Sequence, residues 1–61
     1  MVTTKYYIED LIDGFVLQED GSWDWFIDLD EKVFATYDEA VLYIEGLDDG
    51  VYRVFSRITK S

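Results

Sequence analysis

Residues 36–51 read TYDEAVLYIEGLDDGV, and this stretch decides the fold because it contains the signals for both ends of one helix. Thr36 is followed three residues later by Glu39, the spacing of a capping box, in which two side chains satisfy free amides at the helix start. Acidic residues in the first turn also suit the positive end of the helix dipole. Two glycines in the second half are stop signals. The stretch therefore predicts a helix from position 37 to about position 45 or 47.

Apolar residues recur along this predicted helix at a spacing that places them on one face. The stripe comprises Ala40, Val41 and Ile44, and it includes Leu47 if the helix extends that far. A helix with one apolar face needs a second layer to bury that face. The segments on either side of it must supply that layer.

Those segments have the composition of strands. Residues 3–9 (TTKYYIE) predict a first strand, and residues 10–14 form a bulge, a bend or a short helical turn. Residues 15–29 predict a hairpin around a Gly-containing turn, and residues 51–59 predict the last strand. The predicted fold class is α+β: a three- to four-stranded antiparallel sheet with one helix packed on one face, in β-β-β-α-β order. Residues 1–61 form a single domain.

Alternation along the predicted strands assigns their side chains to the two faces of the sheet. The row expected under the helix is Trp23, Trp25, Ile27 and Leu29, continued by Tyr52, Val54, Ser56 and Ile58. The row expected on the opposite face is Asp24, Phe26, Asp28, Arg53, Phe55 and Arg57. Because one helix cannot cover both faces, aromatic and charged side chains would share an open face, as they do in many binding surfaces.

Two Trp, five Tyr and four Phe residues must stabilise a short chain that has neither Cys nor His. A chain of this length buries only about 60% of the surface that its unfolded form exposes, and neither a disulfide nor a Cys/His zinc site is available. The residues expected in the core are Trp23, Trp25, Phe34 and Tyr52. Phe26 and Phe55 are expected outside it as contacts for a partner, and Tyr43 is assigned to neither place.

The net charge of the chain is −9, and the charges are unevenly distributed. All 14 acidic residues lie between Glu9 and Asp49, where Lys32 is the one opposing charge. Such a surface repels nucleic acids and anionic membranes, and it attracts basic partners. The competing explanation is that the acidity only keeps the protein soluble.

Two residue types that often carry catalysis are missing. Without His and Cys, the chain lacks the most common general base and the thiol nucleophile. Asp24 and Asp28 resemble the carboxylate pair of a glycosidase, but a domain of this size has little room for a deep cleft. We therefore expect a protein that is not an enzyme and that needs no cofactor.

Residues 20–31 (DGSWDWFIDLDE) have the rhythm of a calcium-binding EF-hand loop, with oxygen-bearing side chains at five of its ligand positions. The sixth position holds Trp25, where that loop requires Gly for a sharp turn. Positive φ is costly for such a bulky residue, and the flanking segments predict strands instead of helices. A calcium-binding module is therefore a remote alternative, and no metal ligands are assigned.

The second half of the chain, about residues 33–58, resembles the small inhibitors of bacterial RNA polymerase made by T7-type phages. The likeness rests on Phe34-Ala35, the TYDEA motif at 36–40, the apolar helix, and Gly50 followed by a strand that ends in basic residues. More broadly, the chain resembles a small acidic phage-type inhibitor domain.

Members of that family are small α+β proteins that dock on polymerase through a negatively charged strip and Arg residues of the last strand. The resemblance implies that Arg53 and Arg57 are partner contacts and that Asp24 and Asp28 belong to the strip.

The leading hypothesis is a small acidic inhibitor, encoded by a phage or mobile element, that docks on a basic nucleic-acid-binding surface of a host enzyme. RNA polymerase and defence nucleases such as CRISPR effectors are the expected targets, and carboxylates would imitate phosphates. The expected contacts are Asp20, Asp24, Phe26, Asp28, Asp30, Glu31, Arg53, Phe55 and Arg57. The alternative is a structural or regulatory adaptor that self-associates through the open sheet face or an exposed edge strand.

The chain is expected in the cytoplasm, of a host cell if a phage encodes it, as a monomer or homodimer. No apolar run approaches the roughly 20 residues that span a bilayer, and residues 1–5 lack the apolar stretch of a signal peptide. A thin basic strip near the C-terminus does not support direct binding of nucleic acid.

Overall fold

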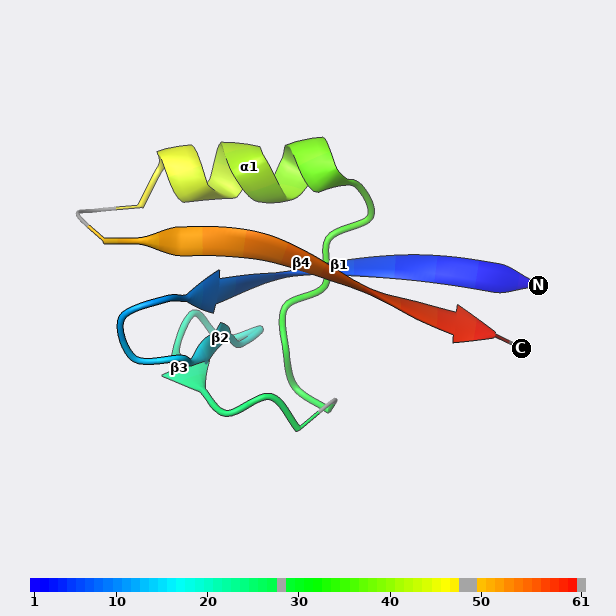
Figure 1. Cartoon of the computed structure of the whole chain (residues 1–61), viewed down its shortest axis with the longest axis horizontal. Helices are drawn as coiled ribbons and strands as arrows, with labels where there is room; N and C mark the ends of the chain where they lie inside the picture. Colours follow the sequence, from blue (N-terminus) through cyan, green and yellow to red (C-terminus); the bar gives the residue numbers. More distant parts are fainter. Residues whose placement is uncertain (28, 48–49, 61) are drawn as a thin grey trace.

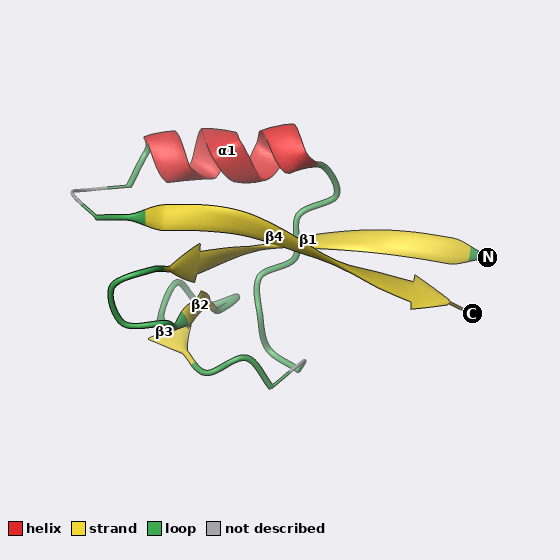
Figure 2. Ribbon diagram, in the orientation of Figure 1, coloured by secondary structure: helices red, strands yellow, loops and turns green. Residues whose placement is uncertain are grey.

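Five elements make up the described part of the chain in this computed structural model (Figures 1 and 2). The structure describes residues 1–27, 29–47 and 50–60. The elements in chain order are β1 (Val2–Asp10), β2 (Val16–Leu17), β3 (Trp23–Asp24), α1 (Tyr37–Glu45) and β4 (Tyr52–Lys60). The strands form one antiparallel sheet in the order β3-β2-β1-β4, and α1 packs on one face of it. The predicted fold class is confirmed.

The two long strands, β1 and β4, form the centre of the sheet. They pair antiparallel over their whole lengths, from Val2 opposite Lys60 to Asp10 opposite Tyr52. The two ends of the chain consequently lie side by side at one end of the molecule (Figure 1). Strand β1 extends one residue beyond its predicted bounds at each end, and β4 is shifted by one residue toward the C-terminus.

Residues 10–14 form a hydrogen-bonded turn between β1 and β2. The Gly14 amide donates to the Asp10 carbonyl over 2.7 Å, and Gly14 has a φ of 77°, which side-chain-bearing residues rarely adopt. The Asp10 carboxylate also accepts from the Ile12 amide at 2.8 Å. Of the three conformations that the sequence left open, the structure therefore has a turn.

The hairpin predicted over residues 15–29 is much shorter in the structure, because β3 ends at Asp24. Beyond Asp24, side-chain carboxylates accept hydrogen bonds from backbone amides in place of a neighbouring strand. The Asp24 carboxylate accepts from the Trp25 amide at 2.7 Å, and the Glu31 carboxylate accepts from the Ile27 amide at 2.8 Å. With these amides satisfied, the chain leaves the sheet after β3.

This departure overturns the predicted row of four apolar side chains under the helix. Trp23 does lie on the helix side, where its ring stacks on Tyr52 at 5.4 Å between centroids. Trp25, Ile27 and Leu29 instead have exposed fractions of 64%, 57% and 80%. The assignment of Trp25 to the core was therefore wrong, because alternation continues in the sequence after the strand has ended.

Helix α1 starts at the capping box. The Thr36 hydroxyl accepts from the Glu39 amide at 3.2 Å, as the spacing predicts. The Glu39 carboxylate accepts from the Ala35 amide at 3.3 Å, one residue before the expected one, because a Glu side chain reaches either amide. The helix ends at Glu45, and Gly46 caps it.

The main core lies between α1 and the sheet. Its buried members are Ile8, Leu17, Phe34 and Ala40. The partly buried residues packed against them are Tyr6, Trp23, Tyr43, Ile44, Tyr52 and Val54. Three of the four predicted core aromatic residues are thus confirmed, and Tyr43 joins them with its ring 5.5 Å from that of Phe34.

The sheet face opposite α1 is covered as well, which corrects the prediction of an open face. Tyr7 on β1 is 2% exposed. Its ring stacks on Phe55 and meets Phe26 edge-on, both at 5.2 Å between centroids. Phe26 and Phe55 are consequently half-buried and not free contacts, because the segment after Asp24 folds over this face and removes apolar surface from water.

Candidate functional site

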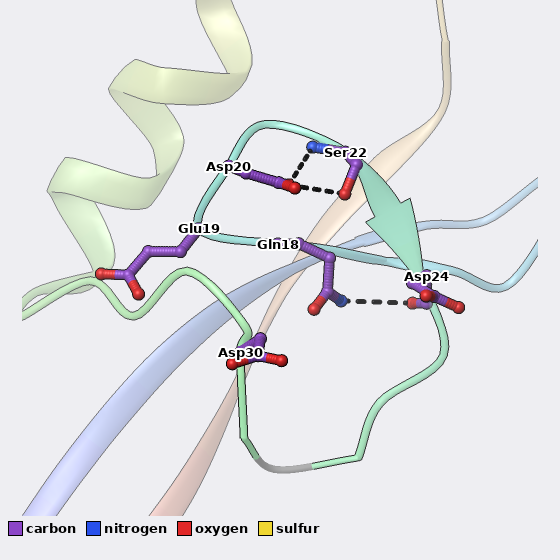
Figure 3. A pocket seen from close by; sticks show the side chains of 6 residues that line it. All are labelled: Gln18, Glu19, Asp20, Ser22, Asp24 and Asp30. Atoms are coloured by element: carbon purple, nitrogen blue, oxygen red, sulfur yellow. Dashed lines mark hydrogen bonds between the residues drawn. The ribbon is translucent and has the colours of Figure 1, made fainter.

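The first candidate site is an acidic pocket of about 350 Å³ at the turn between β2 and β3 (Figure 3). We define the acidic pocket by its lining residues, Gln18, Glu19, Asp20, Ser22, Asp24 and Asp30. Asp30 reaches it from a separate segment because the Glu19 amide donates to the Asp30 carbonyl at 2.9 Å. Four carboxylates from two segments therefore share one surface.

The turn that carries the pocket is held by its own backbone. The Gln18 amide donates to the Ser22 carbonyl at 2.8 Å, and the Gly21 amide donates to the Gln18 carbonyl at 3.0 Å. Gly21 has a φ of 90°, a conformation that favours Gly. The side chains around the turn consequently project from a defined framework.

Asp20 is the carboxylate whose ionisation the turn controls. Its Oδ1 atom accepts from the Ser22 hydroxyl at 2.6 Å and from the Ser22 amide at 2.9 Å. The hydroxyl hydrogen bond, followed by the amide hydrogen bond, lowers the pKa of Asp20 below its ordinary value. Asp20 is therefore ionised at neutral pH and fixed in orientation.

Gln18 is a structural member of the pocket wall. Its side chain is buried, and its amide nitrogen donates to the Val16 carbonyl at 2.9 Å and the Asp24 carbonyl at 3.5 Å. The bond to Asp24, drawn as a dashed line in Figure 3, connects the end of β2 to the end of β3. Gln18 thus fixes the position from which the Asp24 carboxylate points outward.

The electrostatic character of the acidic pocket is uniformly negative. Its four carboxylates belong to exposed residues, and none of its six lining residues is basic. Lys32, the one cation in the acidic part of the sequence, has its ammonium 5.6 Å from the Phe34 ring centroid. Exposed and uncompensated carboxylates of this kind attract cationic partners over long distances.

The geometry of the described residues does not support a metal centre. Among residues 1–27, 29–47 and 50–60, no three carboxylates converge closely enough to hold a metal ion. The EF-hand alternative also requires Asp28, which lies outside the described residues.

The second candidate site is a mainly apolar pocket of about 310 Å³ on the sheet face opposite α1. We define the aromatic pocket by its principal walls, Glu9, Trp25, Phe26, Arg53 and Phe55. Trp25 is 64% exposed, and the ring of Phe15 meets it edge-on at 4.9 Å. The two pockets adjoin, because Asp24 lines one and the next residue lines the other.

Both arginines of β4 contact groups around the aromatic pocket. The Arg53 guanidinium forms an ion pair with the Glu9 carboxylate across the β1–β4 ladder. The Arg57 guanidinium lies 5.1 Å from the centroid of the Phe26 ring, a cation–π arrangement. These contacts orient the arginines and leave part of each side chain in solvent.

The residues predicted as partner contacts fall into two adjoining groups. Asp20, Asp24 and Asp30 lie in the acidic pocket. Phe26, Arg53 and Phe55 line the aromatic pocket, with Arg57 over the Phe26 ring. Asp28, another predicted contact, falls outside the described residues.

Glu31 is the predicted contact that the structure corrects. Its side chain is 5% exposed and is used internally to accept the Ile27 amide. Sequence reasoning placed Glu31 on the surface as one of a series of carboxylates that could imitate phosphates. A buried carboxylate with a backbone partner stabilises the loop instead of meeting another protein.

Sequence reasoning missed several members of the two pockets, among them Glu9, Glu19 and Trp25. The position of Glu9 opposite Arg53 requires the register of β1 and β4, which no local pattern reveals. Glu19 was assigned only to the turn, although its position beside Asp20 signals a shared surface. Trp25 was missed because it was assigned to the core.

No family model, no curated protein and no solved structure matches this chain. Among the described residues, no helix is both long enough and apolar enough to cross a membrane.

Proposed function

We propose that this chain is a small acidic inhibitor, encoded by a phage or mobile element, that docks on a basic nucleic-acid-binding surface of a host enzyme. The observation that carries the proposal is the acidic pocket, in which four exposed carboxylates project from a hydrogen-bonded turn without a basic neighbour in its lining. RNA polymerase and defence nucleases, including CRISPR effectors, are the targets with suitable surfaces.

The acidic pocket suits a phosphate-binding surface for a physical reason. Lys and Arg side chains that bind the nucleic-acid backbone are arranged for anionic oxygens. Carboxylates present oxygens of the same charge sign and accept the same charge-assisted hydrogen bonds. Because the turn already fixes Asp20, less conformational entropy is lost on docking than with mobile side chains.

The aromatic pocket supplies an anchor beside the charged surface. Trp and Arg dominate the binding energy of many protein interfaces, and the exposed Trp25 stands close to Arg53 there. In this proposal the carboxylates steer the approach, while Trp25 contributes apolar contact area after docking. The partner surface would be basic with an adjacent apolar site.

The test is a pull-down from bacterial lysate with tagged protein, washed at low and high salt, followed by affinity measurement on the recovered enzyme. The pocket variant is Glu19→Gln, Asp20→Asn and Asp30→Asn together. The matched control is Asp13→Asn, Asp38→Asn and Glu45→Gln, which neutralises the same number of exposed acidic residues elsewhere.

At about 0.7 kcal/mol for each exposed ion pair, the pocket variant should lose about 2 kcal/mol, or roughly 30-fold in affinity. The control should bind nearly as well as the unchanged chain. Equal losses in both variants would assign the effect to net charge alone. An affinity that high salt leaves unchanged would contradict charge-led docking.

A further inference from the structure

The outer edge of β4 has no strand beside it in the described part of the chain. β4 is the last strand in the order β3-β2-β1-β4 (Figure 2). Its nine residues pair with β1 without interruption, so no bulge twists the edge away, and the chain has no Pro to break it. A long, regular edge of this kind is a template for pairing with another strand.

The hydrogen bonds of β1 determine which backbone groups of β4 face outward. Tyr6 exchanges two hydrogen bonds with Phe34, at 3.1 and 2.9 Å, so its amide and carbonyl point away from β4. Tyr6 and its partner Ser56 are therefore a non-hydrogen-bonded pair, and Ser56 directs its own amide and carbonyl to the free edge. The outward-facing residues, taken alternately, are Tyr52, Val54, Ser56, Ile58 and Lys60.

We propose that this edge pairs antiparallel with the same edge of a second copy, with the two-fold axis at Ser56. In antiparallel pairing, a residue whose amide and carbonyl face the partner strand lies opposite another residue of that kind. When the two strands are identical and symmetric, one residue therefore lies on the two-fold axis, opposite the same residue of the second copy. An axis at Arg57 would oppose two identical guanidinium groups, and an axis at Phe55 would oppose Arg53 to Arg57. Like charges directly opposite are destabilising, whereas the axis at Ser56 avoids them and pairs the whole strand.

The side chains that this register brings together are complementary on both faces. On the α1 side, Val54 faces Ile58 of the second copy, and Ile58 is 65% exposed in the single chain. On the opposite side, Phe55 faces Arg57 of the second copy, in a chain where Arg57 already contacts the Phe26 ring. Apolar pairs and cation–π contacts of these kinds stabilise paired strands.

The charge distribution favours β4 as the contact between two acidic proteins. β4 contains no acidic residue, although the chain carries a net charge of −9. The paired edges would form about ten backbone hydrogen bonds, two for each of five facing pairs. The remaining repulsion between the two bodies is screened by salt, so dimerisation should strengthen as ionic strength rises.

Single cysteines test the register, because the natural chain contains no Cys. Two Ser56→Cys chains would place the Cα atoms of the new side chains about 5.5 Å apart, within the reach of a disulfide. In Ile58→Cys the corresponding atoms would be about 14 Å apart, too far for a bond. We expect Ser56→Cys to form a cross-linked dimer at least tenfold faster than Ile58→Cys under mild oxidation.

Analytical ultracentrifugation of the unmodified chain tests the association itself. The expected result is a mass that rises with concentration from 7.2 kDa toward twice that value, and more readily at high salt. Ile58→Lys should abolish the rise, whereas Leu42→Lys, at a helix position that is 66% exposed, should not.

A mass of 7.2 kDa at every concentration and salt level would overturn the proposal and leave the edge for a strand of another protein. Equal cross-linking rates for the two cysteine variants would also overturn it. The outcome is separate from that of the proposed inhibitor function, because salt acts on the two kinds of binding in opposite directions.

Discussion

Replacing Phe26 with Ala tests whether the segment after β3 folds over the second sheet face. The Phe26 ring lies 5.2 Å from Tyr7, 5.7 Å from Phe55 and 5.1 Å from the Arg57 guanidinium. A fully buried Phe loses about 3–5 kcal/mol on truncation to Ala. Phe26 is half-buried, so we expect Phe26→Ala to lower the free energy of unfolding by about 2 kcal/mol.

The assay is urea unfolding followed by tryptophan fluorescence and circular dichroism, together with thermal unfolding. For a domain of this size, about 2 kcal/mol corresponds to a fall in Tm of roughly 8–16 °C. The matched control is Leu29→Ala, in the same segment but 80% exposed, which should change stability by less than about 0.5 kcal/mol.

These two substitutions distinguish the observed structure from the alternative that alternation predicts, in which residues 23–29 form one strand. If residues 23–29 formed one strand with Leu29 under the helix, Leu29→Ala would be the damaging change and Phe26→Ala the mild one. That reversed ranking would refute the covered second face.

Three further predictions concern local features of the fold: a side-chain hydrogen bond, a helix cap and a glycine with positive φ. Removing the hydroxyl in Ser22→Ala should raise the pKa of Asp20 toward its ordinary value, as measured by NMR titration. Because the pKa of Asp20 is depressed in the folded state, its ionised form stabilises the fold above the unfolded-state pKa, and this stabilisation is lost as the pH falls through the folded-state pKa. Ser22→Ala should therefore lose less stability than the unchanged chain when the pH is lowered. Thr36→Ala removes the helix cap and should cost about 1 kcal/mol in urea unfolding, and an equal stability in both proteins would contradict the cap. Gly21→Ala should cost about 1 kcal/mol from backbone strain alone, since no atom lies within 4 Å of the added methyl group, and unchanged stability would argue against the positive φ.

The helix was predictable because its signals are local. Thr36 and Glu39 lie within one turn of each other, so their hydrogen bonds depend little on the rest of the chain. The long strands were predictable for a similar reason, since their composition and alternation extend over nine residues. The register that places Glu9 against Arg53 was not predictable, because it depends on contacts between opposite ends of the chain.

The end of β3 was not predictable from alternation because the pattern carries no information about hydrogen-bond partners. The stretch from Trp23 to Leu29 alternates as a strand does, yet Asp24 and Glu31 satisfy the amides of Trp25 and Ile27. Much of the acidic pocket followed from charge density in the sequence. The aromatic pocket did not, because it exists only where the chain has left the sheet.

The separation of charges along the chain keeps the acidic pocket apart from the edge that we propose for dimerisation. The acidic pocket lies at the β2–β3 turn, whereas the free edge belongs to β4, and two strands, β2 and β1, stand between β3 and β4 in the sheet. A dimer joined at β4 would therefore keep both acidic pockets in solvent. Two linked pockets raise the effective concentration of the second site once the first is bound. A basic channel long enough to meet both would bind the dimer more tightly than a single chain, whereas a compact basic surface would not distinguish them.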